Sequence, residues 1–196
     1  MRYHRDDIVE RAVALLDAYG LADLSMRRLG ADLGVQPSAL YHHYANKQTL
    51  LAAVADELLR RGARPRPPGS WEDRVVVVCA ELRDAMLAYR DGADLVATVH
   101  AFGLGAQAPG VELEAVLTSA GFGDELSRVA ARTLLHFVFG HTADEQAHLQ
   151  AASAGAVDGP PRDSSDFDLG LDLILAGLRH ASRPDGPPRE APARRG

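Results

Sequence analysis

Apolar residues recur every three or four positions along most of the chain, and no stretch alternates convincingly as a β-strand would. This spacing predicts an all-α protein. Two side chains suited to helix starts, Ser25 and Asn46, and two glycines suited to helix ends, Gly20 and Gly34, divide the first part of the chain. The helices expected there cover about residues 5–19, 26–33, a short stretch from Pro37, and 47–61.

A second run of helices is expected after the proline-rich connector Arg64–Gly69, which cannot be helical. Ser70, with Asp73 three residues later, resembles a capping signal for a long fifth helix. A loop rich in Gly, Pro and Ser covers 153–165, and the Pro-rich chain from Ser182 onward is expected to be disordered. The other helices are expected at about residues 93–106, 110–120, 124–151 and 166–181.

The segment Leu24–Tyr44 predicts a helix, a tight turn at Gly34 and a second helix that projects from its support. Such a helix can enter the major groove of DNA, which is about 12 Å wide. Lys47, the only lysine of the chain, stands at the start of the next helix, where it and the helix dipole can meet a phosphate. The residues expected to face outward from the projecting helix are Gln36, Ser38, Ala39, Tyr41, His42 and His43.

Two observations weigh against a DNA-binding role. A helix-turn-helix can simply pack, with Tyr41 and Tyr44 as core aromatics, although we expect only Tyr44 to be buried. The net charge at pH 7 is also −6. However, residues 1–62 hold eight basic and eight acidic residues, and no acid occurs between Leu33 and Lys47. An acid-free surface suits phosphate even on an acidic protein.

Composition disfavours several other classes of protein. With one cysteine, Cys79, the chain cannot form an internal disulfide, and its start lacks the apolar core of a signal peptide. The longest β-branched run, Val75–Val78, is far too short to cross a bilayer, so we expect a cytoplasmic protein without a membrane partner. Gly103–Ala108 echoes a dinucleotide fingerprint but follows no strand, and no catalytic arrangement stands out. We therefore expect neither an enzyme nor a cofactor.

The segment Leu24–Tyr44 resembles the signature of the TetR family of transcriptional regulators, in which the turn glycine, the Leu-Tyr-x-His run and the downstream Asn-Lys recur at this spacing. The resemblance covers about residues 5–60 and implies a three-helix, helix-turn-helix DNA-binding domain. Arg27 falls where the tetracycline repressor has a base-reading arginine, whereas His42 replaces an aromatic of that repressor. The DNA contacts implied, to which we add Ser25, are at Arg27, Gln36, Pro37, Ser38, Ala39, Tyr41, His42, His43 and Lys47.

The rest of the chain resembles the tetracycline repressor subfamily. The resemblance implies a larger α-helical domain with a ligand cavity, and a homodimer made by the helix at 124–151 and the last helix. Gly170 and Gly177, beside Ile174, also favour close approach of another helix, although the same stripe can instead seal the core of one subunit. The segments that carry the resemblance are Arg90–Ala93, Ala120–Gly123, Phe137–Gln146 and Phe167–Leu178.

Departures from the subfamily change the expected ligand. The metal-coordinating histidine of the tetracycline repressor falls at Val96 and its acidic partner at Asp144, while drug-binding polar groups fall at Ala63 and Val78 and an aromatic at Leu82. A more apolar pocket disfavours tetracycline with magnesium and favours a small, largely apolar effector. The ligand-binding residues expected are Val78, Leu82, Met86, Val96, His100, Phe137, His141 and Asp144.

Two assignments of histidines stay open. His141, Asp144 or Glu145, and His148 share a helix face that invites a metal, but two imidazoles seven residues apart lie about 10 Å apart along the axis. Roles in a polar pocket or a dimer interface are favoured, and no metal is expected. His100 either lines the pocket or is an exposed or core histidine.

Together these patterns predict a ligand-responsive transcriptional regulator, a repressor by family resemblance, that binds palindromic double-stranded operator DNA as a homodimer and is released by a small-molecule effector. The alternatives are a DNA-binding protein without an effector, which the long second half disfavours, and a helical small-molecule-binding protein or enzyme. The expected domains are a helix-turn-helix domain at 1–46, a connecting helix at 47–62, a ligand-binding and dimerisation domain at 63–181, and a disordered tail at 182–196.

Overall fold

The computed structural model describes residues 3–66, 68–156 and 165–182, and within them it contains nine α-helices and no β-strand. The predicted all-α fold is confirmed. Most of the loop at 153–165 and nearly all of the tail from 182 lie outside the described residues. In chain order the helices are α1 (Arg5–Tyr19), α2 (Met26–Leu33), α3 (Pro37–Tyr41), α4 (Lys47–Gly62), α5 (Trp71–Leu87), α6 (Gly92–Ala101), α7 (Ala108–Ser119), α8 (Asp124–Ser153) and α9 (Phe167–Ala181).

Local capping groups set most of the helix starts. The Ser25 hydroxyl accepts a hydrogen bond from the Arg28 N–H at 3.2 Å, so α2 begins where the sequence predicts. Reciprocal capping bonds between Asn46 and Thr49 start α4, and a matching pair starts α5. Each of these signals lies within four residues of sequence, and for that reason they were readable without a structure.

The end of α6 is the main departure from the predicted helices. The expected helix at 93–106 stops at Ala101, and the chain then turns through Gly103 (φ +67°) and Ala106 (φ +56°). Ala106 donates its N–H to the Asp56 carboxylate of α4 at 2.7 Å. A contact between elements far apart in sequence therefore decides this turn, and helical periodicity does not reveal it.

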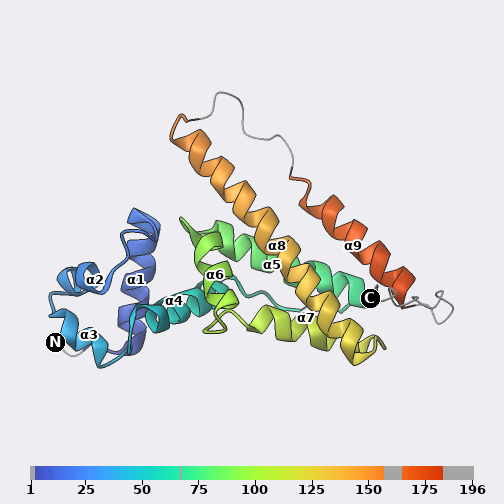
Figure 1. Ribbon diagram of the computed structural model, residues 1–196, viewed down its shortest axis with the longest axis horizontal. Coiled ribbons are helices and arrows are strands. Elements are labelled where there is room, and N and C mark those ends of the chain that lie inside the picture. The colour runs from blue at the N-terminus through green and yellow to red at the C-terminus, as the bar shows by residue number, and fades with distance from the viewer. Residues whose placement is uncertain (1–2, 67, 157–164, 183–196) are drawn as a thin grey trace, which may run out of the picture.

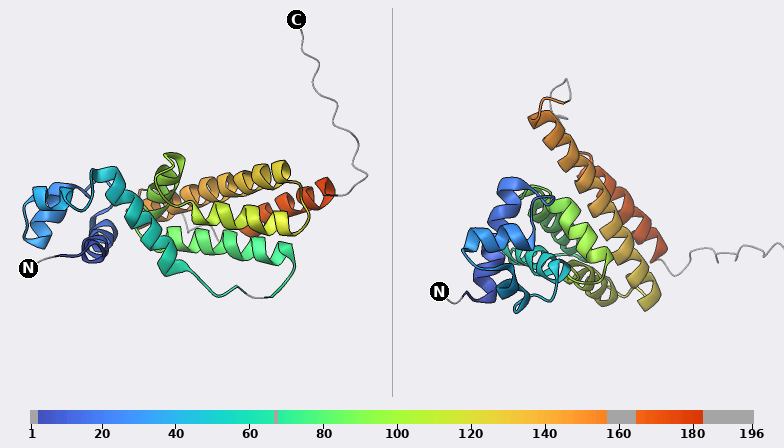
Figure 2. Two further views of the ribbon diagram at one scale, coloured as in Figure 1. Left: turned by 90° about the horizontal axis from the view of Figure 1, so that it is seen from below. Right: turned by 60° about the vertical axis from the view of Figure 1, so that its left-hand side comes forward.

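The helices form two parts, which we call the head (α1–α3) and the body (α5–α9). Figure 1 shows the head at one end, with α4 running from it to the body. The left view of Figure 2 shows the same arrangement from below, with the head at the end of an elongated molecule. One helix therefore connects the two parts directly.

Helices α8 and α9 lie side by side along one edge of the body (Figures 1 and 2). A Cβ on Gly170 would lie 2.6 Å from the Phe137 ring of α8, so this glycine allows α9 to approach α8 of the same chain. A Cβ on Gly177 would have no described atom within 4 Å. Gly170 therefore serves packing within the chain, whereas the Cβ position of Gly177 faces open space.

None of the helices among the described residues has the length and the apolar character needed to span a bilayer.

Candidate functional site

Close packing of α2 against α3 supports the projecting helix. A Cβ on Gly30 would lie 3.0 Å from the Val35 carbonyl oxygen, so glycine lets the two helices meet. Gly34 closes the turn in the left-handed conformation, at φ +67°. Leu29 and Leu40 are fully buried and anchor α2 and α3 respectively. The short α3 is thus fixed on one side and open on the other.

The outer side of α3 carries polar and small side chains. Tyr41 is 50% exposed, whereas Tyr44 is 5% exposed. Burial of Tyr41 as a core aromatic is therefore excluded, and the prediction that Tyr44 is core is confirmed. Of the predicted DNA contacts on this segment, Gln36, Ser38, Tyr41 and His42 are exposed, and Pro37, Ala39 and His43 are half-buried.

Basic residues beside α3 differ in whether they are already paired. Arg28 forms an ion pair with Asp23 at 2.8 Å, and its guanidinium lies 3.8 Å from the centre of the Tyr19 ring. Arg27 is exposed and has no hydrogen bond or ion pair with any described residue. Lys47 begins α4 next to α3. Arg27 and Lys47 are therefore available to a phosphate or a base edge, whereas Arg28 already donates one N–H to Asp23.

The head also contains a contact that the sequence did not reveal. Arg5, at the start of α1, donates to the carbonyl of His43, with its Nε at 3.1 Å, and its guanidinium lies 5.1 Å from the Tyr44 ring. The Tyr44 hydroxyl donates back to the Arg5 carbonyl at 3.3 Å. These bonds hold the end of α3 against α1. Because the residues lie 38 and 39 positions apart, no local pattern indicated the contact.

A pocket of about 610 Å³ lies in the body, between α4, α5, α7 and the turn that leads into α7. Its apolar walls include Leu59, Val78, Leu82 and Ala85. Two of the residues predicted to bind a ligand, Val78 and Leu82, therefore line it. The charged and amide side chains that line the pocket are Asp56, Arg60, Arg66, Glu81, Gln107 and Glu112.

The other six residues predicted to bind a ligand lie outside this pocket. Met86 and Val96 are fully buried in the core. His100 lines a separate pocket of about 320 Å³ and contacts the Ala106 carbonyl through Nδ1 at 3.0 Å. Phe137 and His141 pack with Phe167 of α9, and Asp144 is exposed on α8. The structure thus does not bring the eight predicted positions together in one site.

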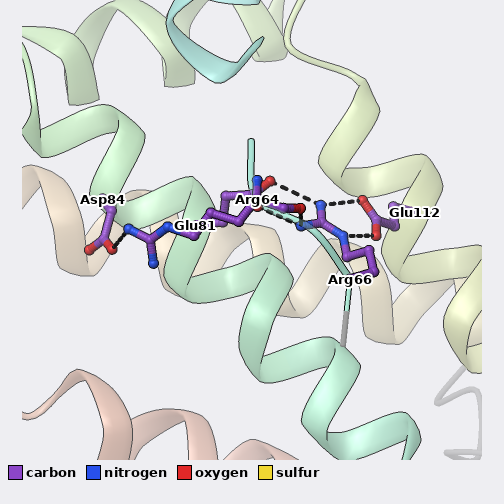
Figure 3. Close-up of polar contacts among 5 residues, drawn as sticks. All are labelled: Arg64, Arg66, Glu81, Asp84 and Glu112. Atoms are coloured by element: carbon purple, nitrogen blue, oxygen red, sulfur yellow. Dashed lines mark hydrogen bonds and ion pairs between the residues drawn. The ribbon is translucent and has the colours of Figure 1, made fainter. Parts of the chain in front are cut away.

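Three charged residues join the connector to two walls of the pocket, and we call them the Arg66 clasp: Arg66, Glu81 and Glu112. The Arg66 guanidinium lies between the two carboxylates and donates to both (Figure 3). The side chains are partly shielded, with 34% of Arg66, 12% of Glu81 and 35% of Glu112 exposed. Burial alone would raise the pKa of Glu81, but the bonds from Arg66 and from the Arg64 N–H lower it.

Sequence reasoning missed the clasp, because its members come from the connector, α5 and α7. Each looks like an ordinary surface charge in its own stretch of sequence. The only local hint is the pair of arginines, Arg64 and Arg66, in a connector that is otherwise proline and glycine. Arg64 continues the network with an ion pair to Asp84 at 2.7 Å (Figure 3).

The histidine-rich face of α8 makes contacts with its neighbouring helices. No group of three or more His, Cys, Asp or Glu side chains is placed to hold a metal ion within residues 3–66, 68–156 and 165–182. Glu145 instead pairs with Arg83 of α5 through Arg83 Nε at 2.9 Å, and His141 stacks edge-on against Phe167 at 5.4 Å between ring centres. This face of α8 therefore packs α5 and α9 together.

Comparisons with known proteins cover both parts of the chain. Residues 8–54 match the family model described as bacterial regulatory proteins, tetR family, and residues 64–165 match the tetracyclin repressor-like, C-terminal domain. The tetracycline repressor protein class A from transposon 1721 of Escherichia coli is 36% identical over 198 residues, which cover 87% of this chain and 88% of the relative.

Solved structures agree with these matches. BioQ of Mycobacterium smegmatis has a TM-score of 0.85 at 39% identity, covering 92% of this chain and 99% of its own. BioQ with its natural double-stranded DNA operator has a TM-score of 0.79 at 39% identity, with 90% and 98% covered. Streptomyces coelicolor ActR in complex with (S)-DNPA has a TM-score of 0.75 at 31% identity, with 92% and 99% covered.

Proposed function

The chain belongs to the TetR family of bacterial regulatory proteins and is a DNA-binding transcriptional regulator with a helix-turn-helix, and we propose that it is a repressor released from palindromic operator DNA by a small, largely apolar effector. The observation that carries the proposal is the exposed side of α3, which presents Tyr41 and His42, together with the unpaired cations Arg27 of α2 and Lys47 of α4. The relative BioQ has been solved with its DNA operator, which supports the same role for this head.

We propose that a second copy of the chain covers the outer face of α8 and α9. Large apolar side chains of these two helices are exposed in the single chain, with Val129 46%, Leu169 63% and Leu173 68% exposed. Burying such residues against a second copy removes apolar area from water. A two-fold dimer would present two copies of α3, and a palindromic operator requires them about 34 Å apart. The cytoplasmic location and the lack of catalysis expected from the sequence stay predictions.

Helix α4 is the proposed route from effector to DNA, and we keep residues 1–46, 47–62 and 63–181 as the three functional parts. Lys47 at its start lies beside α3, whereas Leu59 and Ala63 at its end line the pocket. The helix is tightly held: a Cβ on Gly62 would lie 2.7 Å from that of Ala85, and one on Gly105 would lie 3.1 Å from the Ala52 carbonyl oxygen. An effector that binds better to a form with displaced α4 would shift the population toward release.

The test is DNA binding by the purified full-length chain to a duplex selected from a random-sequence library. Tyr41→Ala and Lys47→Ala are each expected to weaken binding by about tenfold, because each removes a phosphate or base contact. Phe102→Ala is the control, since Phe102 is an exposed aromatic (64%) that lies at the end of α6 in the body. Selection of no preferred duplex, or equal binding by all four proteins, would reject the assignment of α3 as the reading helix.

A further inference from the structure

The effector pocket combines apolar walls with an acidic rim. Leu59, Val78 and Leu82 from α4 and α5 form apolar wall, while Asp56, Glu81 and Glu112 contribute three carboxylates. A volume of about 610 Å³ falls in the range of small-molecule sites. The pocket therefore offers a ligand an apolar surface and negative charge together.

Arg66 cannot offer a hydrogen bond to an anionic ligand without giving one up. A guanidinium has five N–H donors. Arg66 donates two to Glu81, two to Glu112 and one to the Arg64 carbonyl, at 2.5 to 3.0 Å. All five donors are therefore in use (Figure 3). A carboxylate or phosphate entering here would have to break the clasp and would then face two unpaired glutamates.

The other basic side chain of the pocket is also paired. Arg60 makes a two-pronged ion pair with Glu57 of its own helix, with both bonds at 2.7 Å. Asp56 accepts the Ala106 N–H and has no ion pair among the described residues. If the Arg66 guanidinium leaves, the charged side chains that line the pocket are three carboxylates and Arg60, so their net charge is negative.

We infer that the effector is an organic cation with an apolar body, whose positive group takes the place of the Arg66 guanidinium between Glu81 and Glu112. The exchange keeps both carboxylates paired, which avoids leaving a partly buried charge uncompensated. Its apolar body would lie against Leu59 and Leu82. Arg66 follows the end of α4 by four residues, so its displacement frees the connector that holds that end. The inference rests on the proposed function and specifies its effector.

Two pairs of probes with related ring systems and opposite charge test the inference. Tetraphenylphosphonium is compared with tetraphenylborate, and rhodamine 6G with fluorescein, by calorimetry and fluorescence anisotropy on the full-length chain. We expect the cation of each pair to bind at least about tenfold more tightly, because Glu81 and Glu112 attract its charge and repel that of the anion. Binding of neither cation, or equal or tighter binding of the anions, overturns the inference.

Three variants separate charge recognition from a structural role. Glu81→Gln and Glu112→Gln are each expected to weaken cation binding by about tenfold. Arg66→Gln is expected to strengthen it several-fold, because the competing guanidinium is removed, and to weaken any anion binding, because Glu81 and Glu112 then lack their cation. A merely structural clasp would make Arg66→Gln weaken binding of every probe. Asp84→Asn is the control, since Asp84 pairs with Arg64 beside the clasp but does not line the pocket.

Operator binding is measured on the same proteins, so that the repressor assignment and the effector class can be rejected independently of each other. If the chain selects a duplex and cation probes neither bind nor release it, the effector class is wrong and the regulator assignment stands. If cations bind as expected but no duplex is selected, the repressor assignment is wrong and the cation site stands.

Discussion

The head and the body of this protein build their sites in different ways. In the head, the side chains proposed to meet DNA fall between Ser25 and Lys47, and a buried leucine and a glycine turn position them. In the body, the pocket draws on residues from Asp56 to Glu112, which lie in α4, the connector, α5, α7 and the turn before α7. The head therefore presents a site that its own local sequence defines, whereas the pocket exists only when distant elements pack.

Helix α4 is not the sole connection between these parts. The Arg90 N–H donates to the Asp17 carboxylate of α1 at 3.4 Å. Next to it, Asp91 starts α6 in the left-handed conformation at φ +55°. Its carboxylate accepts the Leu21 N–H of the α1–α2 turn at 2.8 Å and the Gln150 side-chain amide of α8 at 2.9 Å. Movement of α6 or α8 can thus reach the head without passing through α4.

The largest expected effect compares two neighbouring residues of α3. Leu40→Ala should lower the free energy of unfolding by about 3 kcal/mol, because it leaves a cavity under α3. Tyr41→Ala should change stability by less than about 0.5 kcal/mol and still weaken DNA binding. Urea denaturation followed by circular dichroism checks both. Equal losses of stability would mean that the two sides of α3 are not distinct.

The second-largest loss of stability is expected from a substitution at Gln146 in the body. Gln146 is 7% exposed, and its amide accepts the Ala93 N–H and donates to the carbonyls of Met86 and Tyr89. Gln146→Leu should cost about 2 kcal/mol, because two buried backbone groups and one half-buried one lose their partner. Gln48→Leu, at an exposed position of α4, is the matched control in the same denaturation assay. A small effect at Gln146 would show that the body does not depend on contacts between distant elements.

A smaller effect is expected at the turn of the head. Gly34 has a φ of +67° and open space around its Cβ position, so Gly34→Ala adds backbone strain without a clash. We expect a loss of about 1 kcal/mol, and a smaller loss for Gly34→Asn, since asparagine tolerates this conformation better. Thermal unfolding measures the difference. Identical losses for both variants would point to a cause other than the backbone conformation.

The smallest effect depends on pH. Hydrogen bonds from Arg60 and then Arg61, acting against burial, lower the pKa of Glu57 from 4.5 to about 2. This stabilisation is present above pH 4.5 and is lost as the pH falls from 4.5 toward 2. It should stay below about 1 kcal/mol, because the Arg60 side chain is 72% exposed and screened by water.

Glu57→Gln isolates that contribution. The variant should be less stable than the unmodified chain at pH 7, and the gap should close as the pH approaches 2. Unfolding free energies measured at several pH values check this. A gap that is the same at pH 7 and pH 2 would mean that the ion pairs of α4 do not stabilise the fold.

Local sequence determined the helices and the face of α3. Capping pairs such as Asn46 with Thr49 act within one turn of helix, and the apolar stripe that buries Leu40 also exposes Tyr41. Of the eight residues predicted to bind a ligand, two, Val78 and Leu82, line the pocket. Met86 and Val96, also predicted to bind the ligand, lie in the core, and whether they contact an effector stays a prediction.

Only the tertiary structure decided the early end of α6, the role of Gly170 against α8, and the placement of Arg66 between Glu81 and Glu112. The physical reason is the separation along the chain of the residues that interact. Helix periodicity and capping act over a few residues, so a sequence displays them directly. A hydrogen bond or ion pair between residues 46 positions apart, such as Arg66 and Glu112, leaves no periodic trace and appears only when the chain has packed.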